Sequence, residues 1–516
     1  MLFSITMTYL NGGKITMNNE LFDSELILAA EDFPDDQFQK YHTFSSYENK
    51  IIRKLIAHGP VLIRGGRGSG KSALLKEAYF RSNSTPFSET ILGIYISLRH
   101  LPLLRTEGKD YEHYFCKLVI DNIKKSMRSS DEETEDFNPN PDIGELQQEL
   151  LKLSTNIQKR IILFFDDAAH IGRETSLKEF FDIFRTLSSN TVSCKAAIYP
   201  GVTEFGSRFD LLNDANVIDI ARNEENPSFS SFFREIIEVR YSSSVDTDNI
   251  KLPLDDFARF LGRAVTGNVR AFIYAMNYLI ELSDEDSIGL LEIEKTLKNL
   301  AIEYYWPLLE ELQPKLGKYE PLVDPARELA EILYDDVSKL VDRPDYGPSC
   351  LINREVVERL KKLFEIMEYA GFVVKRDSSR AMKNGGRGTR YILNLCNLLE
   401  VMPSNRLTTD LFKKWNTIEK EYTQIHRRGI LDKISLPPLE ESSNLGILDK
   451  DISVLAKSKA YPYGLTPHRM RKLEQGNFST VGDIAEAKDE ELLKLEDIGD
   501  IWLNRIKSVV GQAIWM

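Results

Sequence analysis

The segment at residues 61–72 constrains the fold of this chain more than any other stretch. It reads Val-Leu-Ile-Arg-Gly-Gly-Arg-Gly-Ser-Gly-Lys-Ser, an apolar strand followed by a glycine-rich turn and the start of a helix. The glycines allow consecutive backbone N–H groups to turn inward around a phosphate, and the helix N-terminus adds a favourable dipole. Lys71 is predicted to reach the β- and γ-phosphate oxygens, and the Ser72 hydroxyl is predicted to bind Mg²⁺. The alternative is a glycine-rich turn that binds nothing. The residues predicted to contact a nucleotide are Gly65, Gly66, Arg67, Gly68, Ser69, Gly70, Lys71, Ser72 and Ala73.

The composition favours several intracellular domains. The chain has 516 residues, whereas single hydrophobic cores seldom grow beyond about 250–300 residues. Four widely spaced cysteines show no metal-ligand spacing and indicate a reducing compartment. The N-terminus lacks a basic start and no apolar run approaches the roughly 20 residues that span a bilayer, so we expect a cytoplasmic protein without membrane contact. A net charge of −13 argues against a nucleic-acid footprint over the whole surface, but it leaves a local one open.

Apolar runs alternate with helical patterns after the glycine-rich loop. Near-continuous apolar strands of this kind are typical of a parallel sheet that helices cover on both faces. The predicted strands lie at 91–98, 160–167, 192–199 and 217–221, with helices near 111–127 and 144–155.

One of these strands ends in two acids, Asp166 and Asp167. We expect Asp166 to hold the Mg²⁺ shell, directly or through water, and Asp167 to orient or deprotonate an attacking water. ATPases of this type usually carry Glu at the second position, so Asp167 is one methylene shorter. This difference leaves binding intact and bears on the hydrolysis rate. His170 is predicted to be a polar residue on the following helical turn.

A resemblance to a known family rests on residues 266–270, Thr-Gly-Asn-Val-Arg. This segment resembles the sensor-2 motif of AAA+ ATPases, particularly the Gly-Asp-x-Arg of origin-recognition-type initiators. The resemblance implies a sheet of order 5-1-4-3-2, a helical lid and then a winged-helix domain. It also implies that Arg270 reaches the γ-phosphate and reports whether ATP or ADP is bound. The alternative is a helix N-terminal arginine on a solvated face.

The segment 199–210 occupies the place where AAA+ proteins keep their sensor-1 residue and inter-subunit arginine finger. The usual sensor-1 Asn is absent, and Thr203 is the nearest polar candidate. Ser-Arg-Phe at 207–209 looks like the finger-bearing motif, which implies that Arg208 acts on the nucleotide of a neighbouring subunit. A surface arginine near a turn is the alternative.

The region 325–395 has the outline of a winged helix. Helical spacing at 325–341 and 353–369 precedes two strand-like segments around Asn384-Gly-Gly386. The predicted wing is basic, with Asp377 as its one acid, and such an excess of positive charge suits phosphate contact. A flexible basic loop that is merely solvated is the alternative. The residues predicted to contact nucleic acid are Lys375, Arg376, Arg380, Lys383, Arg387 and Arg390.

The last segment, 465–507, resembles a tandem helix-hairpin-helix module. Such modules offer backbone N–H groups of a Gly-x-Gly hairpin to a DNA phosphate. Here Asp497 replaces the first glycine, and Glu496 and Asp500 lie beside it. Because these acids repel phosphate, a protein-interaction role is the alternative to DNA binding.

The sequence therefore predicts an α/β protein with a parallel-sheet P-loop AAA+ core, an α-helical lid, a winged-helix domain and a small all-α domain resembling a helix-hairpin-helix. We expect a switch that binds and hydrolyses ATP with Mg²⁺, assembles with copies of itself or an AAA+ partner, and engages DNA and an unidentified effector. Bacterial relatives with this plan resemble components of anti-phage or mobile-element systems. The alternative is a signalling or scaffold ATPase whose nucleotide state gates a partner protein without DNA; a small-molecule kinase fits the lid and the long tail less well. The predicted boundaries are 1–40 for an N-terminal extension, 41–225 for the core, 226–313 for the lid, 314–403 for the winged helix, 404–457 for a connector and 458–516 for the last domain.

Overall fold

The computed structural model describes most of the chain after residue 29. The described residues are 30, 33–100, 102–103, 106–129, 137–169, 174–202, 205, 208–242, 249–283, 287–439, 446–457 and 464–515. His170 and Thr203 lie outside them.

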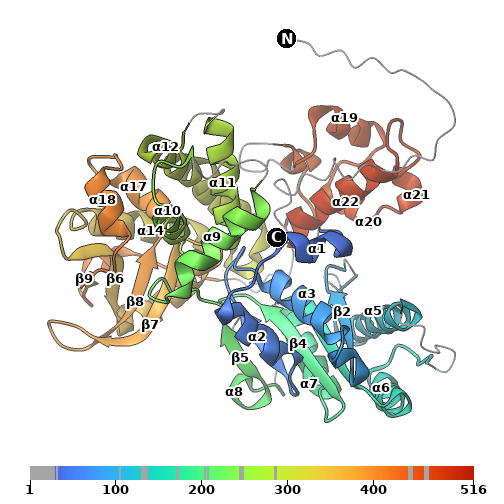
Figure 1. The fold of residues 1–516 in the computed structure, drawn as a ribbon. Coiled ribbons are helices and arrows are strands. Elements are labelled where there is room, and N and C mark those ends of the chain that lie inside the picture. The colour runs from blue at the N-terminus through green and yellow to red at the C-terminus, as the bar shows by residue number, and fades with distance from the viewer. Residues whose placement is uncertain are drawn as a thin grey trace.

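A five-stranded parallel sheet forms the first domain (Figure 1). Its strand order is β2-β3-β4-β1-β5, which is the predicted order 5-1-4-3-2 counted from the other edge. Every strand pair in it is parallel, so the predicted α/β core with a parallel sheet is confirmed. The strands are β1 (Val61–Arg64), β2 (Ile91–Ser97), β3 (Arg160–Ala169), β4 (Val192–Ile198) and β5 (Asn216–Asp219).

Two apolar clusters cover the two faces of this sheet. One face packs Ile63 and Phe164 against helices that flank the glycine-rich loop, and the other packs Phe165 against Phe115 and Phe180. Burial on both faces explains why the strands are apolar throughout instead of alternating. The helices of the first face are α2 (Ser46–Ile56) and α3 (Lys71–Ser82), and those of the second are α5 (Gly108–Ser129), α6 (Ile143–Ile157) and α7 (Glu174–Leu187). Shorter elements are α1 (Asp35–Tyr41), η4 (Phe87–Glu89) and α8 (Leu211–Asp214).

A helical lid follows the parallel sheet. It shares one apolar core with the domain after it, because Phe260 of the lid contacts the rings of Phe412 and Trp415 at centroid distances of 4.6 and 6.4 Å. The same apolar core continues across the predicted boundary at residue 313. The lid contains α9 (Ser228–Arg240), α10 (Leu254–Ala264), α11 (Val269–Ser283), α12 (Leu290–Leu300), the π-helical turn η6 (Ala301–Tyr305) and α13 (Trp306–Leu312).

We call residues 314–434 the C-terminal sheet domain. Its four strands have the order β7-β8-β6-β9; α14 and the pair α15–α16 cover the two helical segments predicted before the hairpin β7–β8. Two strands were not predicted: β6 lies between these helical segments, and β9 pairs parallel with β6. The predicted connector at 404–457 is therefore wrong in its first part. The elements are η7 (Gln313–Lys315), η8 (Gly317–Leu322), α14 (Val323–Ser338), β6 (Tyr346–Asn353), α15 (Arg354–Arg359), α16 (Lys361–Ala370), β7 (Val373–Ala381), β8 (Arg387–Leu393), α17 (Leu395–Val401), α18 (Thr409–Trp415), β9 (Glu421–Ile425) and η9 (Ile430–Lys433).

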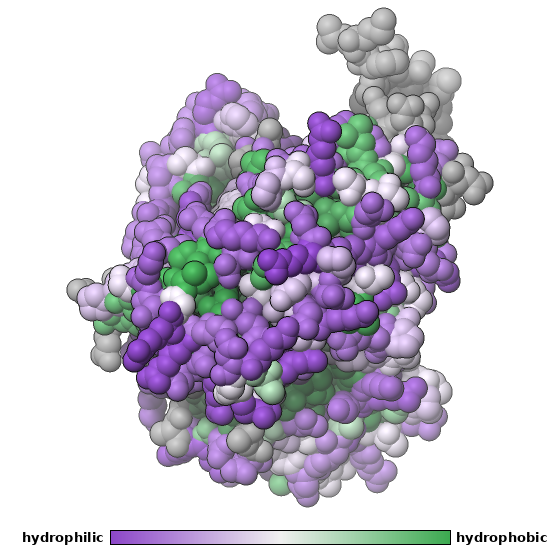
Figure 2. Space-filling model, turned by 90° about the vertical axis from the view of Figure 1, so that its left-hand side faces the viewer, coloured by the Kyte–Doolittle hydropathy of each residue, from purple (hydrophilic) through white to green (hydrophobic). Residues whose placement is uncertain are grey.

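The surface seen from the side of this sheet is mostly hydrophilic, with small hydrophobic patches (Figure 2). Within the described residues, no helix combines the length and apolar character that crossing a membrane requires.

The tail has an apolar core of its own, which begins at Ile447 and not at the predicted residue 458. In the hairpin before α22, Asp497 has a positive φ of 64°, and its carboxylate and that of Glu496 lie 3.7 and 2.6 Å from the Lys472 ammonium. Glu496 and Asp497 are thus paired within the tail. The elements are η10 (Ile452–Leu455), α19 (Pro467–Gln475), α20 (Val481–Glu486), α21 (Asp489–Leu492) and α22 (Asp500–Trp515).

Candidate nucleotide-binding site

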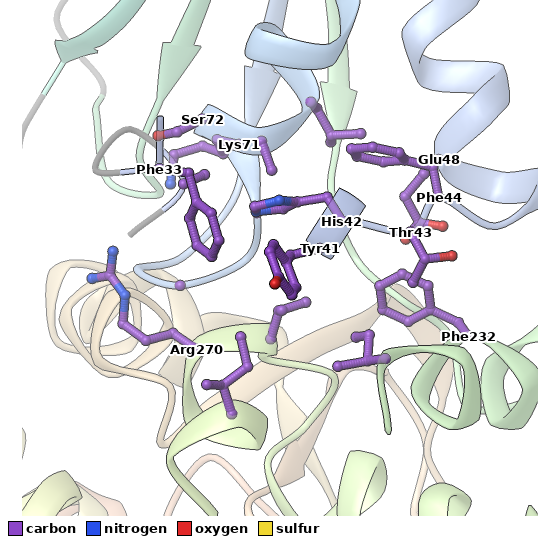
Figure 3. A pocket seen from close by; sticks show the side chains of 18 of the residues that line it. Phe33, Tyr41, His42, Thr43, Phe44, Glu48, Lys71, Ser72, Phe232 and Arg270 are labelled. Carbon is purple, nitrogen blue, oxygen red and sulfur yellow. The ribbon is translucent and has the colours of Figure 1, made fainter. Parts of the chain in front are cut away.

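An open pocket lies at the carboxyl edge of the parallel sheet, between the core and the lid (Figure 3). The carboxyl ends of parallel strands meet at one edge, and ligands of open α/β sheets bind there. The glycine-rich loop, the end of β3, the segments after β2 and β4, and the lid helices α9 and α11 all contribute to its wall. The predicted chemistry is therefore gathered around one cavity.

The loop has the backbone conformation that its glycines permit. Gly68 and Gly70 have φ values of 78° and 90°, a region that disfavours side chains. A Cβ on Gly68 would also lie 2.4 Å from the Asn268 Oδ1 of the lid. Of the nine residues predicted to bind the nucleotide, those that line the pocket are Gly68, Gly70, Lys71, Ser72 and Ala73, whereas Gly65, Gly66, Arg67 and Ser69 do not.

The Lys71 ammonium lies inside the pocket and is almost fully buried. It donates to the backbone oxygens of Gly65 at 2.8 Å and Gly66 at 3.0 Å. It also lies 3.7 Å from the centre of the Tyr199 ring, a cation–π contact. To bind a phosphate oxygen, this ammonium exchanges these three partners for the phosphate.

The predicted magnesium ligands supply hard oxygen atoms. The carboxylate of Asp166 is buried; its Oδ1 accepts the Asp167 N–H at 2.9 Å and its Oδ2 accepts the Tyr95 hydroxyl at 2.5 Å. These bonds fix the carboxylate, which does not itself line the pocket, whereas Ser72 does. A hydroxyl, a carboxylate and phosphate oxygens are the donor set that Mg²⁺ prefers, so these residues fit the ion.

Asp167, the next residue of β3, does line the pocket. Its φ of 53° is unusual for a residue other than glycine, and such conformations cluster at functional sites. Its Oδ2 accepts from Nε of Arg99 at 2.7 Å, in a pair whose side chains are 17% and 5% exposed. The candidate base is thus held by a cation that lines the same pocket.

Arg270 enters the pocket from the first turn of α11. The backbone N–H groups of Val269 and Arg270 donate to the Gly68 oxygen at 3.1 and 3.2 Å. The lid therefore contacts the loop directly, and Arg270 lines the same pocket as Lys71. Its contact with a γ-phosphate stays a prediction.

Arg222 is a further charged residue of the pocket, and the motifs did not single it out. Its Nε pairs with Glu48 at 2.8 Å, and its Nη1 donates to the backbone oxygens of Ser69 at 2.8 Å and Gly267 at 3.2 Å. One guanidinium therefore joins α2, the loop and the lid. Arg99, Tyr199 and Arg222 each follow the end of a predicted strand, and this placement was the signal that could have found them.

Aromatic side chains line the part of the pocket next to the N-terminal segment. Phe33, Tyr41, His42 and Phe44 come from this segment, and Phe232 comes from α9 (Figure 3). Flat aromatic rings suit a planar base. The predicted N-terminal extension thus includes Phe33, a wall residue of the site.

Arg208 lies apart from this cavity. It is exposed on the loop after β4, its backbone oxygen accepts from the Arg185 guanidinium, and it does not line the pocket of its own chain. A role at a neighbour's nucleotide stays a prediction.

Two of the six predicted nucleic-acid contacts are corrected by the structure. The Arg376 side chain is 7% exposed and Arg390 4%; both pair with acids, Arg376 with Glu224 at 2.7 Å and Arg390 with Glu419 at 3.1 Å. Their charges are therefore neutralised by buried acids and do not face solvent. The four that remain exposed are Lys375, Arg380, Lys383 and Arg387.

No family model and no curated protein matches the chain. Among solved structures, the Walker-type ATPase paby2304 of Pyrococcus abyssi matches at 14% identity and a TM-score of 0.41, over 72% of this chain and 96% of that one. The Aeropyrum pernix ORC1 protein in complex with DNA matches at 13% identity and a TM-score of 0.32, over 72% and 94%. Domain III of the Thermotoga maritima replication initiation protein DnaA matches at 18% identity and a TM-score of 0.29, over 53% and 96%. The fold assignment rests on the strand order and loop geometry of this chain.

Proposed function

We propose that this chain is an ATP-binding and ATP-hydrolysing switch of the AAA+ type. The observation that carries the proposal is one pocket that gathers Lys71 of the loop, Asp167 of β3 and Arg270 of the lid. These residues come from segments about 100 residues apart, and each has the chemistry that its place requires. A triphosphate bound here contacts the core and the lid at once. Loss of its terminal phosphate therefore changes the position of the lid relative to the core.

In this mechanism the loop N–H groups and Lys71 would hold the phosphates, and Ser72 and Asp166 would hold Mg²⁺, which would neutralise phosphate charge. Asp167 orients the attacking water and accepts its proton. Arg99 pairs with Asp167 and lines the pocket, so a γ-phosphate competes with Asp167 for the guanidinium. Arg270 contacts the terminal phosphate from the lid, so ATP and ADP favour different lid positions.

Calorimetry with Mg·ATP tests the binding step. We expect Lys71→Ala to abolish binding, and Lys54→Ala, an exposed lysine on α2, to bind like wild type. Asp167→Asn should bind ATP yet release little phosphate, because the amide cannot accept the proton of water. The absence of binding heat in wild type at millimolar nucleotide would refute the proposal.

We further propose that the ATP-bound form engages DNA through the exposed cations at the hairpin β7–β8. Lys375, Arg380, Lys383 and Arg387 support this, although Arg380 and Lys383 lie 3.0 and 2.6 Å from Asp377 and Glu421. Phosphate contact predicts binding that weakens steeply as salt rises. If the protein does not bind a DNA duplex at low salt in the presence of ATP, this role is excluded.

The second candidate is a scaffold ATPase whose nucleotide state gates a partner protein without DNA. The specific observation in its favour is that acids neutralise most of the cations around the hairpin. Assembly measured with ATP, ADP and no nucleotide tests the switch in either case. We expect an ATP-dependent change in the size of the assembly that is lost in Lys71→Ala. Arg208→Ala should retain this size change but hydrolyse little ATP.

A further inference from the structure

The side of the glycine-rich loop that faces away from the pocket lies against the end of α16. An ideal Cβ on Gly66 would lie 2.6 Å from the backbone oxygen of Glu368, so the two backbones meet with no room for a side chain. The Arg67 N–H donates to the backbone oxygen of Tyr369 at 3.0 Å. The C-terminal sheet domain therefore contacts the phosphate-binding loop itself.

A second connection passes through two aromatic rings. The Lys71 ammonium lies over Tyr199, and the Tyr199 ring packs against Tyr369 at a centroid distance of 4.8 Å. Tyr199 is 6% exposed and Tyr369 4%, so water does not separate these groups. Lys362 of α16 also donates to the Gly201 oxygen at 2.8 Å, just beyond Tyr199. The lysine that would bind phosphate is thus part of the contact between the core and α16.

Lys71 cannot hold its present partners and a phosphate together. The same ammonium neutralises the carbonyl dipoles of Gly65 and Gly66 and attracts the face of Tyr199. When it turns to phosphate oxygens, Gly66, which touches α16, loses this cation, and Tyr199, which touches Tyr369, loses its cation–π contact. Both changes weaken the contact between the loop and α16.

We propose that triphosphate binding and docking of the C-terminal sheet domain on the phosphate-binding loop oppose each other, with Tyr199 and Tyr369 as the connection. This inference rests on the proposed function and names the regulation of the same site. Binding ATP loosens α16 and the hairpin β7–β8 from the loop, and docking holds Lys71 away from phosphate. Because coupling between two binding equilibria is reciprocal, weaker docking must raise nucleotide affinity.

The test uses the full chain, Mg²⁺ and a non-hydrolysable ATP analogue. In wild type, amide hydrogen exchange in residues 361–381 should rise when the analogue binds. Tyr369→Leu, which removes the ring from the contact, should bind the analogue roughly three- to tenfold more tightly by calorimetry, the size expected for one cation–π and ring contact. Tyr369→Phe keeps the ring, and Tyr422→Leu removes a tyrosine of β9 in the same domain, so both should bind like wild type.

The possible outcomes separate the two proposals. If wild type binds the analogue and exchange in 361–381 stays unchanged or falls, the coupling is wrong and the nucleotide site stands. Equal affinities of Tyr369→Leu and wild type also overturn the coupling. If Tyr369→Leu does not fold, the exchange measurement on wild type decides alone. If wild type binds no analogue, the proposed function fails and the coupling fails with it.

Discussion

Replacing Arg376 with methionine should destabilise the protein far more than a change in a solvated basic loop. The Arg376 guanidinium contacts Glu224 through Nε at 3.0 Å and Nη2 at 2.7 Å, and Nη2 also donates to the Arg222 oxygen at 2.8 Å. Both side chains are buried, at 7% and 6% exposure. Methionine preserves the apolar stem and removes the charge, so the change isolates the ion pair.

The magnitude follows from the burial of the partner that remains. Removing one member of a buried ion pair costs about 3–5 kcal/mol, because the other charge stays buried without compensation. Arg390 lies 3.9 Å from Glu224 and offsets part of the loss, so we expect about 3 kcal/mol. Total stabilities of about 5–15 kcal/mol are typical, so this loss is large. In Arg380→Met the exposed pair with Asp377 is lost, and the expected cost is within about 0.5 kcal/mol.

Acid sensitivity gives a second measurement of the same pair. Burial raises the pKa of Glu224, but the charge and hydrogen bonds of Arg376 outweigh burial and leave the pKa below its ordinary value of 4.5. A depressed carboxyl pKa adds stability above the ordinary pKa, and this stability is lost as pH falls through the folded value. Wild type should therefore lose this contribution below about pH 4.5, and Arg376→Met should show a weaker dependence there.

Urea unfolding at pH 7, followed by the fluorescence of buried Trp415 and the other tryptophans, compares the three proteins. The reasoning is refuted if Arg376→Met shifts the midpoint no further than Arg380→Met does. A double variant with Glu224→Met should recover much of the loss, since paired replacement of buried charges by apolar groups is often neutral.

Three other predictions concern the site and its surroundings. Arg99→Ala should raise phosphate release several-fold, because it frees Asp167, and should weaken ATP binding, because it removes a cation for which the γ-phosphate competes; unchanged turnover measured by phosphate release would show that the pair is only structural. Burial raises the pKa of Glu368 to about 7, so its contribution to stability is fully present below pH 4.5 and is lost as pH rises through 7. The melting temperature of Glu368→Gln should therefore depend less on pH over this window than that of wild type, and an equal dependence would contradict the assignment. Lys383→Ala combined with Arg387→Ala should reduce the magnitude of the slope of log K for DNA binding against log salt by about two, with little loss of stability. Fluorescence anisotropy at three salt concentrations measures this slope, and an unchanged slope would contradict the prediction.

Local spacing in the sequence predicted several of the residues that the structure gathers around one pocket. The loop Gly65–Ser72 and the pair Asp166-Asp167 are consecutive residues at strand ends, and the alternation of apolar runs predicts a parallel sheet. Parallel strands bring their carboxyl ends to one edge, so these residues had to meet once the fold class was known. The resemblance of residues 266–270 to a lid motif added Arg270, which the structure brings to the same pocket.

Only the tertiary structure decided which charges are free and which segments belong together. The region 375–390 looks basic because its neutralising acids, Glu224 and Glu419, lie far from it in sequence. In the same way, β9 joins β6 across about 70 residues, and the end of α16 reaches Gly66 across about 300. No periodicity or spacing records such pairings, because they depend on how whole layers pack. A charge written in the sequence is a local fact, whereas its exposure to solvent is a property of the entire fold.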